Sequence, residues 1–389
     1  MEDYIEEDKY RAEISSLNRE ICSLTERLNE KEYVDKFNPF DNPTEYKGFS
    51  GNYAKIIPEL ENQNVCIPLE PDYQERRNLR RFYSIGGWSM IFQFVMTTAL
   101  ARLALNLILF ILHMISPNMD TGMLYDYMRG SSIVVSLNML IYLVCNVLNA
   151  FIGMKWAGIK PVSVINTKNF SFGNAVQYCM AALFLWVIAI YASNGVNDIL
   201  SKYGYNTFID QSGVGKTVLG TVIITLYNCV IAPITEELFF RGMLLKVFSR
   251  ANQRFAIFST AVFFGLAHGN IPQFLLAFLL GILLANITMK HSSIIPAITV
   301  HIFINTFSTV FGYLSDAEPE VQQVAMLLLF AAAILGMIML LVFHGENRTP
   351  STTPKQSTRG LSVALGSIPF CISFVIQVIY MVYILGSNS

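Results

Sequence analysis

Nine long apolar runs constrain the fold of this chain more than any other feature of its sequence. They lie at residues 85–115, 131–154, 175–195, 216–240, 255–270, 272–290, 292–313, 321–343 and 363–386. Such runs can cross the roughly 30 Å hydrocarbon layer of a bilayer, and a span must be helical because lipid offers no partner to free backbone polar groups. The sequence therefore predicts an all-α, polytopic transmembrane bundle. We expect about eight or nine spans, because the runs at 255–270 and 272–290 are short and close together.

Composition divides the chain into an acidic head, residues 1–84, and an apolar transmembrane domain, residues 85–389. The head holds 18 Asp/Glu and 12 Lys/Arg, whereas the much longer domain holds only 10 Asp/Glu and 15 Lys/Arg. Charged residues make up 14% of the chain, against about 25% in soluble proteins, which excludes a soluble globule. The six cysteines form no CxxC pair, so we expect packing thiols rather than a disulfide scaffold.

The head contains a helical seam, a linker and a basic segment. Apolar residues recur at four- and three-residue steps within 10–30, at Tyr10, Ile14, Leu17, Ile21, Leu24 and Leu28. This spacing is typical of a short coiled coil that would pair chains or dock a partner, or of an amphipathic helix folded onto its own protein. Residues 38–75 have no apolar period and are rich in Pro, Asn and acidic residues, as in a linker.

The basic residues indicate how the chain enters the membrane. Residues 76–84 carry Arg76, Arg77, Arg80 and Arg81 just before the first apolar run, where a topology signal is far commoner than a nucleic-acid patch. With the head inside, cytoplasmic segments collect fourteen Lys/Arg and outer segments three. This positive-inside bias predicts a cytoplasmic N-terminus. Because the acidic first residues form no signal peptide, we expect a multi-pass protein of a bacterial plasma membrane.

With Lys216 and Lys290 assigned to the loops, four charged residues remain within the spans: Arg102, Glu236, Glu237 and Arg241. An ionisable group at membrane depth is costly and indicates a functional site by default, although an isolated one such as Arg102 can snorkel to the interface. Glu237 and Arg241 are spaced i, i+4 in the order that favours an ion pair. Glu236 has no such partner on its helix and is free to face another one. Pro233, which lacks an N–H, predicts a kink just before them.

Two histidines and an asparagine are expected at a depth similar to that of Glu236. Glu236 precedes Arg250 by 14 residues and His268 follows Arg254 by 14 residues, which places each roughly 21 Å from a cytoplasmic marker at the helical rise. His301 follows Lys290 by 11 residues, or roughly 16 Å, and shares a helix face with Asn305 at i+4. Three helices therefore bring polar groups to a common depth.

These residues resemble the three signatures of the CPBP family, the CAAX-protease and bacteriocin-processing (Abi) intramembrane endopeptidases. The family pattern is Glu-Glu-x-x-x-Arg, Phe-x-x-x-His and His-x-x-x-Asn. Here it is met by Glu236 to Arg241, by Phe264 to His268, and by His301 to Asn305, in order and on separate runs. The resemblance covers about residues 216–313. It leaves the head and the last spans unexplained.

The resemblance implies a role for each residue. Glu236 would be the general base that activates a water molecule, aided by His268. Glu237 and Arg241 would hold that carboxylate and its helix in position. His301 and Asn305 would donate hydrogen bonds to the oxyanion of the tetrahedral intermediate. Preorganised donors in a dry site stabilise developing charge well. Because water must reach the site, we expect a polar cavity that opens on one face.

Other functions fit some of the same residues. Two histidines and a glutamate could ligate zinc, but the compact HExxH spacing is missing, so we expect a protease without a cofactor. A proton-coupled transporter would use Glu236 and the histidines as a relay, and a scaffold would act through 10–30 alone. The expected partners are membrane lipid and a peptide or protein substrate, prenylated or not. Neither the family signatures nor the other residues identify that substrate.

Overall fold

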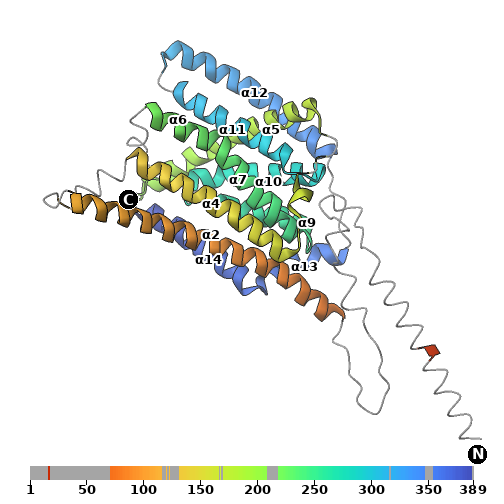
Figure 1. Cartoon of the computed structure of the whole chain (residues 1–389). Helices are drawn as coiled ribbons and strands as arrows, with labels where there is room; N and C mark the ends of the chain where they lie inside the picture. The colour runs from red at the N-terminus through yellow and green to blue at the C-terminus, as the bar shows by residue number, and fades with distance from the viewer. Residues whose placement is uncertain are drawn as a thin grey trace, which may run out of the picture.

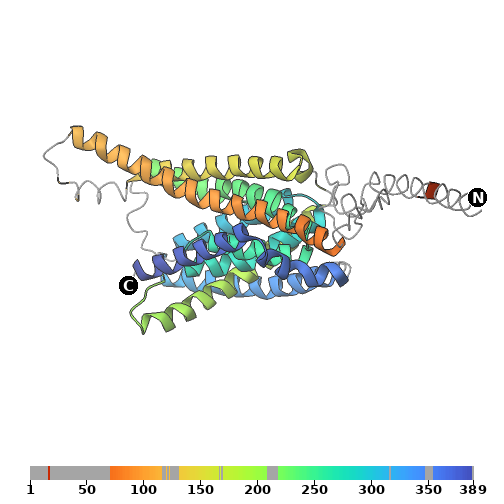
Figure 2. The ribbon, with the colours of Figure 1, turned by 90° about the horizontal axis from the view of Figure 1, so that it is seen from below.

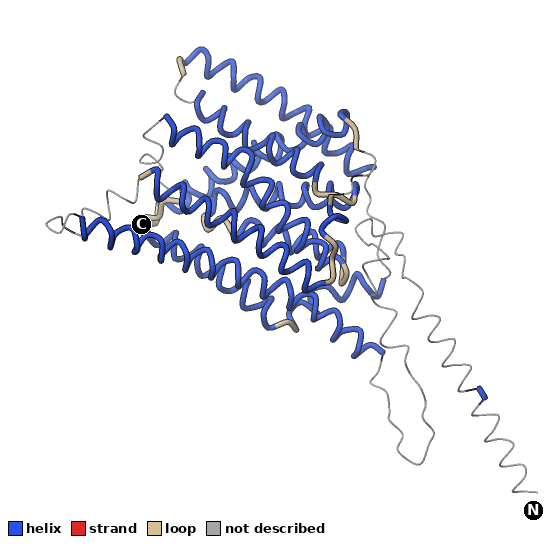
Figure 3. The backbone as a smooth tube through the Cα atoms, in the orientation of Figure 1, coloured by secondary structure: helices blue, strands red, loops and turns tan. Residues whose placement is uncertain are grey.

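A computed structural model describes residues 16–17, 71–115, 120, 122, 131–165, 167, 170–207, 218–314, 317–346 and 354–387. Every regular element in these ranges is a helix, as the backbone tube in Figure 3 shows. The predicted all-α bundle is confirmed. Apart from residues 16–17, the heptad segment 10–30 lies outside the described residues, so the coiled-coil head stays a prediction.

The helices follow the apolar runs of the sequence. In chain order they are α2 (Pro71–Ile115), α4 (Ser132–Ala157), η1 (Pro161–Val164), α5 (Phe172–Ser201), α6 (Val218–Leu226), η2 (Tyr227–Ile231), α7 (Ala232–Glu237), η3 (Leu238–Leu245), α8 (Lys246–Ser249), α9 (Gln253–Leu266), α10 (Ile271–His291), α11 (Ile295–Leu314), α12 (Pro319–Glu346), α13 (Pro354–Leu365) and α14 (Ile368–Ser387). The elements from α6 to α8 form one continuous span, in which η2 and η3 are π-helical.

Eight helices in the described part of the chain are long and apolar enough to cross a membrane. The run at 255–270 forms only the 14-residue helix α9, about 21 Å long and short of a hydrocarbon layer of about 30 Å. The nine runs therefore give eight full spans and one shorter helix. Figures 1 and 2 show α2 beginning at one end of the bundle and α14 ending at the other. The shorter helix α9 thus also carries the chain from one end toward the other.

The basic segment 76–84 is part of the first membrane helix rather than a separate connection. Helix α2 begins at Pro71 and continues without interruption to Ile115, so the last residues of the predicted linker are helical as well. Its four early arginines, Arg76, Arg77, Arg80 and Arg81, are exposed, and so is Arg102 further along. A helix of 45 residues is about 68 Å long, which leaves room for a basic extension beyond the bilayer.

The helices pack around two apolar clusters. The first joins α2, α4, η3, α8, α9 and α14, with Tyr83, Phe248 and Phe263 fully buried in it. The second joins α5, α10, α11 and α12 around Tyr178 and Trp186. The span from α6 to α8, which carries both glutamates, lies between α4 and α11 (Figure 1). The four cysteines described, Cys145, Cys179, Cys229 and Cys371, are free thiols, as expected.

Candidate active site

The helix that carries the two glutamates is irregular on both sides of them. Glu236 and Glu237 end the six-residue α-helix α7, between the π-helical stretches η2 and η3. Pro233 lies at the start of α7, where η2 ends. Since proline cannot donate a backbone hydrogen bond, the interruption falls where the sequence predicts a kink. Single π-helical turns often occur at functional sites, because they change the direction in which neighbouring side chains point.

Glu237 and Arg241 form the ion pair that their spacing predicts. Arg241 Nη1 donates to Glu237 Oε1 at 2.7 Å, and the side chains are 1% and 0% exposed. The guanidinium also lies 4.2 Å from the centre of the Phe264 ring, and its Nη2 is 3.5 Å from the carbonyl of Gly281. Arginine is suited to such a site, because its planar, weakly hydrated group can pair with a carboxylate and stack on a ring together.

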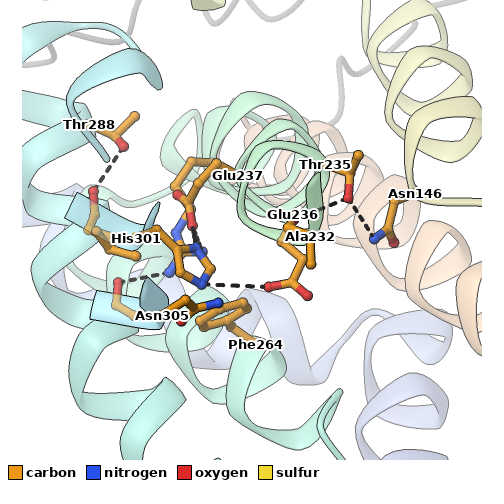
Figure 4. Close-up of polar contacts among 12 residues, drawn as sticks. Asn146, Ala232, Thr235, Glu236, Glu237, Phe264, Thr288, His301 and Asn305 are labelled. Atoms are coloured by element: carbon orange, nitrogen blue, oxygen red, sulfur yellow. Dashed lines mark hydrogen bonds and ion pairs between the residues drawn. The ribbon is translucent and has the colours of Figure 1, made fainter. Parts of the chain in front are cut away.

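His301 lies between the two glutamates. Its Nδ1 is 2.8 Å from Glu237 Oε1, a hydrogen bond in which the nitrogen donates to the carboxylate. Its Nε2 is 3.8 Å from Glu236 Oε2. Figure 4 shows the ring with one nitrogen toward each carboxylate. Glu237 therefore orients His301 and leaves the second ring nitrogen directed at Glu236, much as a carboxylate orients a metal-bound or catalytic histidine.

Glu236 differs from Glu237 in exposure and in bonding. Its side chain is 24% exposed, whereas that of Glu237 is fully buried. The 3.8 Å separation from His301 is longer than a hydrogen bond. Glu236 also interacts electrostatically with Tyr142 of α4 and Tyr227 of η2. Of the two neighbouring carboxylates, Glu236 is thus the one that a molecule from outside can reach.

Asn305 is held at the site by an irregularity in η2. In that stretch the N–H of Ala232 bonds the carbonyl of Tyr227, five residues back. The same pattern would pair the Asn228 carbonyl with the nitrogen of Pro233, which carries no hydrogen. Asn305 Nδ2 instead donates to Asn228 O at 2.9 Å. The amide keeps a second N–H, so it can still donate to a ligand.

His268 lies in the turn that joins α9 to α10. Its Nδ1 is 2.8 Å from the carbonyl of Phe264, and its ring packs edge-on against the Phe264 ring. Gly269 follows with a positive φ of 71°, and Asn270 caps the N-terminus of α10. The Phe264 ring also contacts His301, at 5.7 Å between centres. Phe264 therefore separates the two histidines. Of these two histidines, His301 is the one whose contact with Glu236 the structure records.

A metal site would need several of these side chains to converge on one point. Among the residues that the structure describes, no set of three or more His, Cys, Asp and Glu is arranged to hold a metal ion. One nitrogen of His301 is already engaged by Glu237.

Comparison with known families identifies the segment that carries this site. Residues 218–307 match the family model of the type II CAAX prenyl endopeptidase Rce1-like proteins. This segment is similar to the CAAX protease family. The Rce1-like segment contains all three signatures, Glu236 to Arg241, Phe264 to His268, and His301 to Asn305, and confirms the resemblance seen in the sequence. Searches of curated proteins and of solved structures gave no match.

The described part of the chain has eight candidate membrane spans, and the segment that carries the site is similar to a family of prenyl endopeptidases. This favours a peptidase over the transporter and scaffold alternatives. The Rce1-like segment comprises the elements from α6 to α10 and most of α11. It does not include α2, α4 or α14. The side of Glu236 that faces α4 is therefore built by residues that neither the family match nor the sequence motifs include.

Proposed function

We propose that the chain hydrolyses a peptide bond inside the membrane, with Glu236 as the general base that activates a water molecule. The observation that carries this proposal is the pair formed by Glu236 Oε2 and His301 Nε2, 3.8 Å apart. A water oxygen about 2.8 Å from both atoms satisfies ordinary hydrogen-bond geometry. A water held there has a carboxylate beside it to take its proton as it attacks.

The other residues divide the remaining tasks. Arg241 neutralises Glu237, and Glu237 fixes the ring of His301 through Nδ1. The second N–H of Asn305, and His301 when protonated at Nε2, donate to the oxyanion that forms as hydroxide adds to the scissile carbonyl. His268, whose Nδ1 is engaged by the Phe264 carbonyl, keeps Nε2 free to exchange a proton with the leaving amine. The proton taken by Glu236 is returned to the products, so the enzyme ends unchanged.

The substrate is a peptide that reaches Glu236 from the membrane or its surface. A prenylated CaaX tail fits the name of the matched family, and its lipid chain would partition into the bilayer around the bundle. A bacterial peptide processed for export or self-immunity is the other substrate class. We propose that the reaction needs no metal, because the acid, base and oxyanion donors are all supplied by side chains.

Cleavage of synthetic peptides by the purified full chain in liposomes tests the proposal. Prenylated and unprenylated peptides of one sequence distinguish the substrate classes. Glu236→Gln removes the base and is expected to lower kcat by about 10²–10⁴-fold, the range usual for a general base. A chelator is expected to leave the wild-type rate unchanged. Cleavage that survives Glu236→Gln would refute the glutamate mechanism, and loss of activity with the chelator, restored by zinc, would show a metallopeptidase.

A further inference from the structure

Helices α2 and α4 face each other through polar side chains, although both lie in apolar runs. On α2 the positions are four residues apart, and on α4 they are four and three apart, so each set lies on one face of its helix. The six residues, here called the polar zipper, are Ser89, Gln93 and Thr97 of α2 and Tyr142, Asn146 and Asn149 of α4. Five of the six are buried, and Tyr142 is the partly exposed one.

Hydrogen bonds join the zipper in antiparallel order. At one end Asn149 Nδ2 donates to the carbonyl of Ser89 at 2.7 Å and also approaches Gln93 Oε1 at 3.4 Å. In the middle Gln93 Nε2 donates to Asn146 Oδ1. At the other end Thr97 Oγ1 donates to the Gln93 carbonyl of its own helix at 2.7 Å, and Tyr142 occupies the corresponding position of α4. Hydrogen bonds therefore join α2 to α4 at two of the three levels, which fixes the two helices in a single register.

The zipper connects to the catalytic helix at its middle. Asn146 Nδ2 donates to Thr235 Oγ1 at 3.5 Å, and this hydroxyl donates in turn to the Ala232 carbonyl at 3.1 Å (Figure 4). Thr235 is 5% exposed and directly precedes Glu236 in α7. One turn along α4 from Asn146, Tyr142 interacts electrostatically with Glu236 itself. The hydrogen bond from α4 thus falls on the residue directly before Glu236.

Burying these amides in a membrane protein requires a reason. An amide without a hydrogen-bond partner is strongly destabilising in an apolar medium, and interhelical polar contacts in membranes stabilise only weakly on average. Leucine would therefore serve α2–α4 packing almost as well as Gln93 or Asn146. What leucine could not do is hold Thr235. The α7 segment needs such a support, because it is a short α-helical piece between two π-helical stretches.

We propose that the polar zipper of α2 and α4 positions Glu236 for catalysis, with Asn146 as the residue that transmits the constraint through Thr235. The proposal rests on the function given above and extends the active site beyond the matched segment 218–307. Gln93 orients the Asn146 amide so that its N–H faces α7, and Thr235 fixes the rotation of the turn that ends in Glu236. Asn146 and Thr235 are positioning residues that need not touch the substrate.

A pair of substitutions at one position gives the sharpest test. Thr235→Val keeps the shape of the side chain and removes the hydroxyl, whereas Thr235→Ser keeps the hydroxyl. We expect Thr235→Val and Asn146→Leu to lower kcat about tenfold with little change in KM, since small misplacements of a catalytic group can cost up to about 10²-fold. Thr235→Ser should retain most of the wild-type kcat. The double variant should be no worse than either single one.

Gln177→Leu is the matched control for loss of an interhelical hydrogen bond. Gln177 of α5 donates to the carbonyl of Met339 in α12 at 3.5 Å, the same length as the Asn146–Thr235 contact. This variant should keep the wild-type kcat. If Gln177→Leu lowers kcat as much as Asn146→Leu, or if Thr235→Val behaves like Thr235→Ser, the positioning role is wrong.

A second readout separates this proposal from the proposed function. A hydrophobic carbodiimide modifies carboxyl groups, and mass spectrometry of peptides measures its rate at Glu236 whether or not the protein cleaves anything. We expect Asn146→Leu and Thr235→Val to change that rate at least threefold, and Gln177→Leu and Thr235→Ser to leave it unchanged. If the wild type cleaves no peptide, the function fails while the labelling still tests the zipper. Equal labelling in all variants would overturn the zipper proposal alone.

Discussion

The two faces of helix α11 belong to different kinds of structure. One face carries His301 and Asn305 toward the α6–α8 span, where they contact Glu237 and the Asn228 carbonyl. The other carries Phe307 and Phe311, whose rings both pack edge-on against Trp186 of α5. A single helix therefore separates a charged sector, formed by Glu236, Glu237, Arg241 and His301, from an aromatic sector around Trp186 and Tyr178.

The two sectors differ in what holds them together. In the charged sector each buried group depends on one or two specific partners, and losing a partner leaves a charge in an apolar surrounding. In the aromatic sector, which belongs to the apolar cluster of α5, α10, α11 and α12, the stability is distributed over many weak contacts. We infer that substitutions in the charged sector act on both stability and catalysis. Those in the aromatic sector should act on stability alone.

Arg241→Met should have the largest effect on folding. It removes the partner of Glu237, which is fully buried, and breaking a buried ion pair on one side typically costs about 3–5 kcal/mol. We expect a loss of this size in unfolding followed by tryptophan fluorescence in detergent. Peptide cleavage should be lost too, because His301 would no longer be held by a fixed carboxylate.

The double variant Glu237→Gln with Arg241→Met is the control for that prediction. It removes both charges, so no uncompensated charge remains, and much of the stability should return while cleavage stays low. A double variant less stable than Arg241→Met would show that something other than the unpaired Glu237 causes the loss. If Arg241→Met is as stable as the wild type, the claim that buried groups of the charged sector depend on their specific partners is wrong.

Much of the fold and of the site could be predicted from the sequence, for two physical reasons. Lipid permits only helices at this depth, so the length of each apolar run nearly fixes its structure. Ion pairing at i, i+4 depends on one helix alone, which is why Glu237 and Arg241 pair as predicted. The counting of residues from basic markers also placed the polar groups of three helices at a common depth, and His301 does reach both glutamates.

The details that the sequence did not supply depend on contacts between helices. Spacing along α11 does not say which nitrogen of His301 meets which glutamate. The link from Asn305 to Asn228 depends on a π-helical stretch that has no simple sequence signal beyond Pro233. The polar zipper did have a signal, since amides such as Gln93 and Asn146 are uncommon in membrane spans unless they pair. Because these amides carry no charge, the pattern of charged residues in the spans does not reveal them.

The same substitution, Gly→Ala, can be made at a closely packed glycine in each sector. A methyl group on Gly281 of α10 would lie 3.1 Å from the backbone of Ala261 and 3.5 Å from Arg241 Nη2. A methyl group on Gly336 of α12 would collide with the carbonyl of Met180 in α5. Overpacking of this kind costs about 1–3 kcal/mol, so we expect both Gly→Ala variants to melt earlier than the wild type. Only Gly281→Ala should lower the kcat of the molecules that remain folded.

Gly312→Ala is the control for the glycine pair. Gly312 lies on α11, the helix shared by both sectors, and its added methyl group would meet nothing within 4 Å. Alanine favours the helix over glycine by about 1 kcal/mol, so this variant should be as stable as the wild type or slightly more so. If Gly336→Ala also lowers kcat, the aromatic sector is coupled to the site and the division proposed above fails.

Tyr178→Phe should cause the smallest loss of stability among these variants, because it changes a single hydroxyl group in the aromatic sector. The hydroxyl of Tyr178 bonds His291 Nε2 at 2.9 Å, and both side chains are fully buried. Phenylalanine keeps the ring contact with Phe343, at 5.0 Å between centres, and loses the hydrogen bond to His291. Such a loss costs about 1 kcal/mol, which thermal unfolding in detergent can detect, while kcat and KM should stay at wild-type values. A lower kcat would mean that His291, although remote in sequence from Glu236, influences the site through α10. The effect of a substitution on kcat would then depend on whether it removes a polar group, and not on the sector in which it lies.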